Sequence, residues 1–230
     1  HMRTLHDRGY RPCSIESYFQ WIAGSASLPE RSFLLTFDDG FMGVFEHARP
    51  VLLELGWTAT VFVVSARIGG DDAWDEAHNP ARRRHPLMGR AQIERMASEG
   101  FSIQSHSHHH YDLTAIPRAQ LRDELEGSRT ELQAMLGSPV HYLAYPFGRF
   151  DAEVKQAARK AGFLGALTTK PGFNRPCTDA MAVLRLDVAG TDTAGSVLRK
   201  MQFGSNDGSL AAAARYVAGR VAARARLHGA

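Results

Sequence analysis

The sequence predicts an α/β fold in which parallel strands alternate with helical crossovers, as in a (β/α) barrel or a doubly wound sheet. Two observations support this fold class. Short runs rich in β-branched and aromatic residues recur along the chain, and amphipathic segments with helix-ending glycines lie between them. The chain has 230 residues, 44% of them hydrophobic, which is enough for one sizeable core. A single domain spanning residues 1–230 is therefore expected.

Five segments of six or seven residues are predicted to be strands, because each is bounded by turn residues and rich in residues that favour extended chain. In order, they are Ser32–Phe37, Thr58–Val64, Phe101–His106, His141–Pro146 and Leu164–Thr169.

Three segments are predicted to be helices, and each ends at a glycine suited to a helix C-terminus: Gly100, Gly137 and Gly162. The last of them begins at Asp151, a good N-cap residue. The middle one, residues 118–137, has four leucines on one helical face: Leu121, Leu125, Leu132 and Leu136. The Ala- and Arg-rich tail, residues 209–230, is also predicted to be helical and to pack across the fold.

Composition excludes several classes of function. The formal net charge is only +3, so nucleic acid is not expected as a partner. We interpret the basic run Arg82–Arg84 as a solvated loop. Two cysteines, Cys13 and Cys177, cannot build a disulfide framework. No apolar run reaches the roughly 18 to 20 residues of a membrane span.

Candidate site residues lie at the carboxyl ends of three of the predicted strands. Asp38 and Asp39 end the first, His106 ends the third, and Phe147 and Gly148 follow the fourth. In parallel α/β folds, the loops at this edge converge into a site. Two adjacent carboxylates there are costly unless something neutralises them, which indicates a bound cation.

Imidazoles would complete the shell of this cation. His106 and His110 are four residues apart, so a helical turn after the strand would place both side chains on one face. His109 is an alternative to His110, which we prefer. One carboxylate and two histidines leave open positions, as in a catalytic metal site. The donor set suits one divalent ion, with zinc expected and cobalt, nickel, manganese or iron also compatible.

The connection between residues 67 and 86 is longer than most loops, which indicates a functional or mobile segment. Its Trp74 is a candidate for stacking on a sugar ring, although packing on the surface explains it equally well.

Three motifs occur in a fixed order along the chain: TFDDG at 36–40, HSHHH at 106–110 and YPFG at 145–148. Together they resemble the motifs of the polysaccharide deacetylases of carbohydrate esterase family 4, the NodB-homology domain, and in particular their exopolysaccharide-associated branch. The resemblance implies a distorted, TIM-like (β/α) barrel of about seven strands. It also implies metal-dependent removal of N-acetyl groups from an amino-sugar polysaccharide or oligosaccharide.

The resemblance also implies roles for individual residues. Asp39, His106 and His110 would hold the metal, and Asp38 would act as general base on the attacking water. Ser107 would brace the histidine loop. The backbone N–H of Phe147 would stabilise the oxyanion. Substrate contacts are expected from Tyr145 and Pro146.

Three departures from the family pattern stand out. Many members have an arginine where this chain has Ala144, and we expect Arg185 in VLRLDV to replace it beside Asp38. The late histidine that often acts as general acid is absent, so the acid stays unassigned. The chain also begins after the usual first strand of the family, which suggests a truncated N-terminus.

Two other functions stay open at this stage. A sugar-binding pseudoenzyme of the same fold is compatible with the missing arginine and acid. A non-heme iron oxygenase would also use two histidines and a carboxylate, although its expected fold is rich in β-structure. A periplasmic or cell-surface location is slightly favoured, and a cytoplasmic one is left open. The identity of the glycan and the oligomeric state are not determined by the sequence.

Overall fold

The computed structural model describes residues 1–75, 84–216 and 218. Its strands are β1 (Arg11–Pro12), β2 (Ser32–Phe33), β3 (Thr36–Phe37), β4 (Thr60–Val63), β5 (Ser102–Ser105), β6 (Tyr142–Ala144) and β7 (Gly165–Leu167). Its α-helices are α1 (Met2–Asp7), α2 (Ile15–Ile22), α3 (Arg49–Glu54), α4 (Arg90–Ser98), α5 (Arg118–Leu136), α6 (Ala152–Lys160) and α7 (Ala194–Phe203). Short π- or 3₁₀-helical turns are η1 (Val44–Ala48), η2 (Ser65–Arg67), η3 (Ala73–Asp75) and η4 (Pro146–Gly148).

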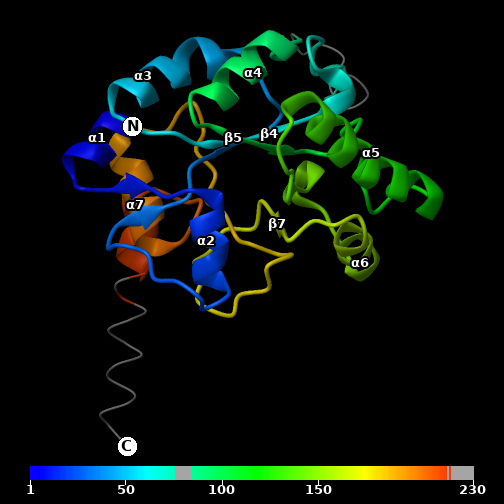
Figure 1. Ribbon diagram of the computed structural model, residues 1–230. Helices are drawn as coiled ribbons and strands as arrows, with labels where there is room; N and C mark the ends of the chain where they lie inside the picture. Colours follow the sequence, from blue (N-terminus) through cyan, green and yellow to red (C-terminus); the bar gives the residue numbers. More distant parts are fainter. Residues whose placement is uncertain (76–83, 217, 219–230) are drawn as a thin grey trace, which may run out of the picture.

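The main sheet has five parallel strands in the order β3-β4-β5-β6-β7, which confirms the predicted α/β fold class. The strand order follows the sequence, because each strand is joined to its neighbour by a crossover. An isolated parallel β-bridge between Leu167 and Val183 extends the sheet beyond β7. Figure 1 shows α3, α4, α5 and α6 placed around these strands, with α1 and α7 beside each other elsewhere in the fold.

One predicted strand proves to be two. Ser32–Phe37 divides into β2, which pairs with β1, and β3, which pairs with β4 in the main sheet. The division turns five predicted strands into six, and β1, which was not predicted from the sequence, brings the number among the described residues to seven. The other four predicted strands are confirmed, each shorter than expected by a few residues.

The helices begin and end where their capping residues lie. The Asp151 side chain accepts a hydrogen bond from the Val154 N–H at the start of α6. Helix α5 ends at Gly137, whose φ of +63° lies in the left-handed region that glycine adopts without steric cost. Of the four leucines predicted to share one face of α5, Leu121, Leu125 and Leu132 are buried and Leu136 is half-buried.

The hydrophobic core lies between the sheet and these helices. All four residues of β4 are buried, as expected for a strand covered on both faces. A second apolar cluster, which includes Ile15, Phe19 and Tyr142, packs α2 against β6. The two layers of packing hold the strand ends in fixed positions.

Two sequence predictions fall largely outside the described residues. Of the basic run, only Arg84 is described, and it pairs with Asp71 at 3.2 Å. Of the predicted tail helix, residues 210–216 are helical, and residues 219–230 lie outside the described part of the chain.

Within the described residues, no helix combines the length and the apolar character that spanning a bilayer would require.

Candidate metal centre and active site

The carboxyl ends of three strands carry the predicted site residues. Asp38 and Asp39 follow β3, His106 follows β5, and Phe147 lies in η4 just after β6. Because β3, β4, β5 and β6 are consecutive parallel strands of one sheet, all of these residues lie at the same edge.

Asp39, His106 and His110 converge on one point. The Nε2 atoms of both histidines lie 3.3 Å from the Oδ1 atom of Asp39, and one potential ligand atom from each residue lies within 4.8 Å of the other two. The His106 and His110 side chains are only 3% and 6% exposed, and the Asp39 side chain is 23% exposed. The three donors therefore face each other in a largely enclosed place.

These residues fit a divalent metal ion. Ligand atoms bound at about 2.0 to 2.1 Å around tetrahedral zinc lie about 3.3 Å apart, which matches both Oδ1–Nε2 distances. The Asp39 Oδ1 atom is buried and has no hydrogen bond within the described structure. The Nδ1 atom of His106 lies 2.7 Å from the carbonyl oxygen of Ala144, which can only accept. Nδ1 therefore donates, and Nε2 of the neutral ring keeps its lone pair for a metal.

Strained backbone conformations bring these side chains together. Among the described residues, six that are not glycine have positive φ, and four of them lie at this site: Asp39, Ser107, His110 and Phe147. Such conformations cost of order 1 to 3 kcal/mol each and concentrate at functional sites. The Ser107 hydroxyl accepts a hydrogen bond from the His110 N–H at 3.1 Å, which stabilises the turn between the two histidines.

The helical turn predicted after His106 is wrong. Residues 106–111 form an irregular loop, and His110 reaches Asp39 through its left-handed backbone, with φ of +66°. The spacing of four residues thus pointed to His110, but the loop brings this residue to Asp39 without a helical turn.

The other two histidines of the cluster face away from Asp39. The His109 Nδ1 atom lies 2.6 Å from Oε1 of Glu124, and the His108 Nδ1 atom lies 3.2 Å from the Ser65 hydroxyl. Glu124 is buried on α5 and also accepts the backbone N–H groups of His108 and His109. The sequence analysis missed Glu124, although a carboxylate one position before Leu125 on an apolar helix face was a detectable signal.

Asp38 is paired with Arg185. The guanidinium donates two hydrogen bonds of 2.7 Å, one to each carboxylate oxygen. It also donates to the carbonyl of Thr168 at 2.8 Å and to the hydroxyl of Thr36 at 3.2 Å. The structure thus places Arg185 beside Asp38, as expected for a residue that replaces the motif arginine missing at Ala144.

These contacts shift the ionisation of the site. Burial acts to raise the pKa of Asp38, but Arg185 and His106 more than offset it, so this pKa lies below its ordinary value. Burial likewise acts to raise the pKa of Asp39, and the imidazoles of His106 and His110 hold it well below the usual range. Burial lowers the pKa of His110, which favours the neutral ring that a metal requires.

The aromatic residues around the site divide into core and rim. Tyr145 is fully buried, donates its hydroxyl to the Met181 carbonyl at 3.0 Å and stacks on Phe150. Pro146 is buried as well. The fully buried Tyr145 side chain offers no surface to a substrate in this structure, whereas a substrate contact by Pro146 stays a prediction. Phe147, in contrast, is 40% exposed.

Trp74 and Phe147 both contact the ring of His110, one of the three candidate metal ligands. The Trp74 ring stacks on it with centroids 4.5 Å apart and an interplanar angle of 27°. The Phe147 ring meets it edge-on at 4.7 Å. Trp74 thus lies beside the site, as a sugar-stacking residue would.

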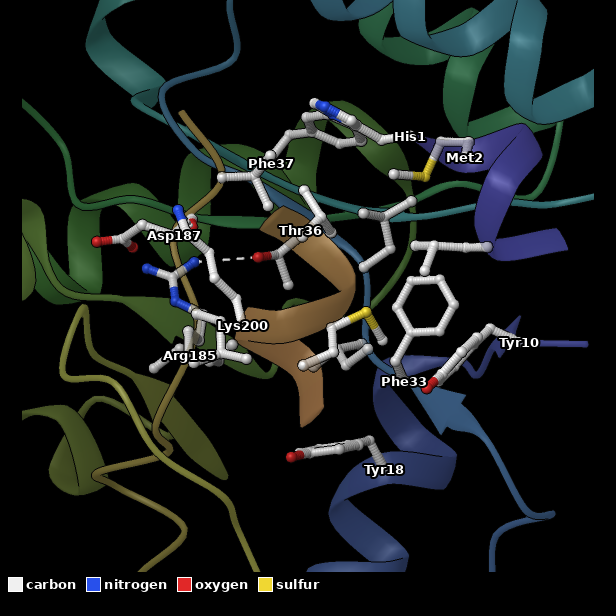
Figure 2. A pocket seen from close by; sticks show the side chains of 18 of the residues that line it. His1, Met2, Tyr10, Tyr18, Phe33, Thr36, Phe37, Arg185, Asp187 and Lys200 are labelled. Carbon is white, nitrogen blue, oxygen red and sulfur yellow. Dashed lines mark hydrogen bonds between the residues drawn. The ribbon is translucent and has the colours of Figure 1, made fainter. Parts of the chain in front are cut away.

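A cavity of about 1410 Å³ extends from this site into the fold. Asp38, Asp39 and Arg185 line it together with apolar side chains such as Met2 and Phe33. Figure 2 shows Arg185 bonded to Thr36 on one side of the cavity, and Phe33 and Tyr10 on another. The Arg185–Asp38 pair is therefore shared between the site and this cavity.

Comparison with known proteins identifies close structural and sequence relatives. The chain is 31% identical over 172 residues to YxkH of Bacillus subtilis strain 168, whose name places it among polysaccharide deacetylases, and the match covers 75% of this chain and 57% of that protein. It is 25% identical to the poly-β-1,6-N-acetyl-D-glucosamine N-deacetylase of Staphylococcus epidermidis, over 70% of this chain and 56% of that one. The chain thus spans little more than half the length of these two relatives.

A solved structure shares the fold. IcaB from Ammonifex degensii superposes with a TM-score of 0.72 at 26% identity, covering 82% of this chain and 81% of that one. The family model for polysaccharide deacetylases matches residues 25–166, which include TFDDG, HSHHH and YPFG. Because this match spans more than half of the chain, it shows that the chain belongs to the polysaccharide deacetylase family.

Proposed function

We propose that this chain is a metal-dependent hydrolase that removes N-acetyl groups from the amino-sugar residues of a polysaccharide or oligosaccharide. The observation that carries the proposal is the convergence of Asp39, His106 and His110 beside a second carboxylate, Asp38. Relatives named for N-deacetylation of poly-β-1,6-N-acetyl-D-glucosamine support the substrate class. Family membership and the parallel sheet argue against the iron oxygenase alternative.

Asp39, His106 and His110 would hold one divalent ion, with zinc expected and cobalt, nickel, manganese or iron also compatible. Such an ion, when bound, polarises a carbonyl oxygen and lowers the pKa of water. The Ala144 carbonyl fixes the His106 ring in the orientation that this role requires.

Asp38 would act as the general base. Its low pKa keeps the carboxylate ionised and ready to accept a proton from the attacking water. The two hydrogen bonds from Arg185 hold the carboxylate in one orientation and leave further lone pairs on each oxygen to accept that proton. Arg185 would therefore be a positioning residue that acts through Asp38.

The backbone N–H of Phe147 would stabilise the oxyanion. Phe147 has φ of +58° within the turn after β6, and the Gly148 N–H is bonded to the Tyr145 carbonyl at 2.8 Å. A backbone donor held in a rigid turn needs no reorganisation during the reaction, which is the basis of oxyanion stabilisation. Buried Tyr145 and Pro146 would support that turn from below.

The test is acetate release from a panel of acetylated glycans, including β-1,6- and β-1,4-linked N-acetylglucosamine oligomers and peptidoglycan. The protein is assayed as purified, after chelation and after restoring zinc, cobalt or manganese. We expect release that chelation abolishes and one of the metals restores. Release that survives complete metal removal would contradict metal dependence. Tight glycan binding with no release from any substrate would support the sugar-binding alternative instead.

A further inference from the structure

Two large apolar side chains that remain exposed lie next to the metal-ligand group. Tyr111 is 43% exposed and directly follows His110 in the chain. Phe147 is 40% exposed, and its ring contacts that of His110. Trp74, half-buried, stacks on the same His110 ring. Two aromatic rings thus contact His110, and a third, that of Tyr111, belongs to the next residue in the chain.

The three aromatic residues come from the loops that follow three neighbouring strands. Trp74 lies after β4, Tyr111 after β5 and Phe147 after β6, and these strands are adjacent in the sheet. Adjacent strands are about 4.8 Å apart, so the loops are spread along the carboxyl edge of the sheet. An elongated ligand lying along this edge would meet more than one of these rings.

A buried carboxylate supports Tyr111. The Tyr111 ring stacks on His109 with centroids 5.5 Å apart and an interplanar angle of 24°. His109 is held in turn by Glu124, whose side chain is 2% exposed and lies 2.6 Å from the His109 Nδ1 atom. This contact accounts for His109, which lies in the histidine motif but faces away from the metal ligands. The His109 ring, held by Glu124, therefore keeps the Tyr111 ring in one position.

An ion pair ties the Tyr111 loop to the Phe147 turn. Arg149 donates to the Asp112 carboxylate at 2.6 Å, and its guanidinium lies 5.6 Å from the Phe147 ring centroid. Asp112 also accepts the Thr114 N–H and hydroxyl. Tyr111 and Phe147 are therefore held in a fixed relation before any ligand arrives, which reduces the entropic cost of binding.

We propose that Tyr111, supported by His109 and Glu124, is the stacking surface for a sugar ring next to the one that loses its acetyl group. The apolar face of a pyranose ring packs against an aromatic ring, and an exposed, preorganised tyrosine provides large contact area at little entropic cost. The inference rests on the proposed function and extends it. The inference implies that the enzyme prefers sugar chains to single amino sugars.

The test compares chain-length dependence between variants. kcat/KM for acetate release is measured on the dimer and the pentamer of β-linked N-acetylglucosamine, using the linkage that the wild type prefers. We expect the wild type to favour the pentamer and Tyr111→Ala to lower the pentamer-to-dimer ratio by about tenfold, mainly through KM. Tyr111→Phe, which keeps the aromatic ring, should have the same pentamer-to-dimer ratio as the wild type. An unchanged ratio in Tyr111→Ala would overturn the inference.

Leu164→Ala is the matched control. Leu164 is 60% exposed and precedes β7, so it lies at the opposite edge of the sheet from the site. Removing this exposed apolar side chain should leave the ratio at the wild-type value. A similar fall in the control would show that the effect of Tyr111→Ala is not specific, and would also overturn the inference.

Binding separates this inference from the proposed function. Calorimetry measures the affinity of the same pentamer for the wild type and for Tyr111→Ala, each in the presence of chelator so that no turnover occurs. A roughly tenfold weaker affinity in the variant supports the stacking surface even if the wild type releases no acetate. Equal affinities would overturn it even if deacetylation is confirmed.

Discussion

The guanidinium of Arg185 clamps both carboxylate oxygens of Asp38 from a strand-like segment 147 residues further along the chain. The same guanidinium is fixed by the Thr168 carbonyl and the Thr36 hydroxyl, at the ends of β7 and β3. Arg185 is only 13% exposed, and the planar fork of arginine matches a carboxylate in a way that lysine does not. The proposed general base therefore has a dedicated cation that comes from a different part of the chain than Ala144.

Replacing Arg185 should shift the pH dependence of activity. The pKa of Asp38 is lowered in the folded protein, so the base is ionised well into the acid range. Arg185→Met removes the cation and leaves burial to raise this pKa. We expect the acid limb of the kcat/KM profile of Arg185→Met to move to higher pH. The acid limb of Arg185→Lys should lie between those of Arg185→Met and the wild type. A parallel fall at all pH values, with no shift of the limb, would assign Arg185 a purely structural role.

Asp38→Asn should separate metal binding from turnover. The amide keeps the shape of the side chain and its contact with Arg185 but cannot accept a proton, so kcat should fall by about 10² to 10⁴-fold. Metal content, measured by elemental analysis after dialysis against zinc, should stay at the wild-type level. Loss of zinc from this variant would mean that Asp38 is itself a ligand.

Zinc should stabilise the folded protein through three named ligands. Binding only to the folded state adds about 2.7 kcal/mol at a metal concentration one hundred times Kd. We therefore expect zinc to raise the melting temperature of the wild type and to have little effect on His110→Ala. His109→Ala is the matched control, because His109 faces Glu124, and it should keep the full zinc response. Equal responses in the two histidine variants would contradict the proposed ligand set.

The strand ends were predictable from sequence because short buried strands and their flanking turn residues are local signals. TFDDG contains β3 and the residues after it, HSHHH and YPFG follow β5 and β6, and the strand order then places all three at one edge. The division of Ser32–Phe37 between two sheets was not predictable, because both halves have the same β-favouring composition and only tertiary pairing separates them.

Side-chain direction in the loops was less accessible from sequence. Tyr145 directly precedes the turn in the YPFG motif, but its ring points into the core to meet Phe150 and Met181. The positive φ of Ser107 has no clear sequence signature, since serine is not among the residues enriched in that region. Arg185 was expected because Ala144 stands where many family members have an arginine. The role of Glu124 could not be predicted without knowing which face of α5 is buried.

Gly148 should be essential to the shape of the YPFG turn. Its φ is +66°, and a Cβ atom there would lie 2.1 Å from the Thr169 hydroxyl oxygen and 2.6 Å from the Thr169 backbone nitrogen. Gly148→Ala therefore combines backbone strain with a clash, and should lower the free energy of unfolding by more than 2 kcal/mol, roughly the sum expected for such effects. Gly190→Ala meets nothing within 4 Å and serves as the control in urea titrations. A fully stable Gly148→Ala would show that the turn adjusts freely.

Tyr145→Phe should affect stability and leave substrate affinity alone. The variant removes a buried hydroxyl that donates to the Met181 carbonyl at 3.0 Å, which should cost about 1 kcal/mol in urea unfolding. The ring remains to stack on Phe150, 5.0 Å away, so the turn that carries Phe147 should keep its position. Because the Tyr145 side chain is fully buried, KM for acetylated oligomers should match that of the wild type. An increase in KM without loss of stability would mean that the tyrosine hydroxyl reaches the substrate after a rearrangement of this turn.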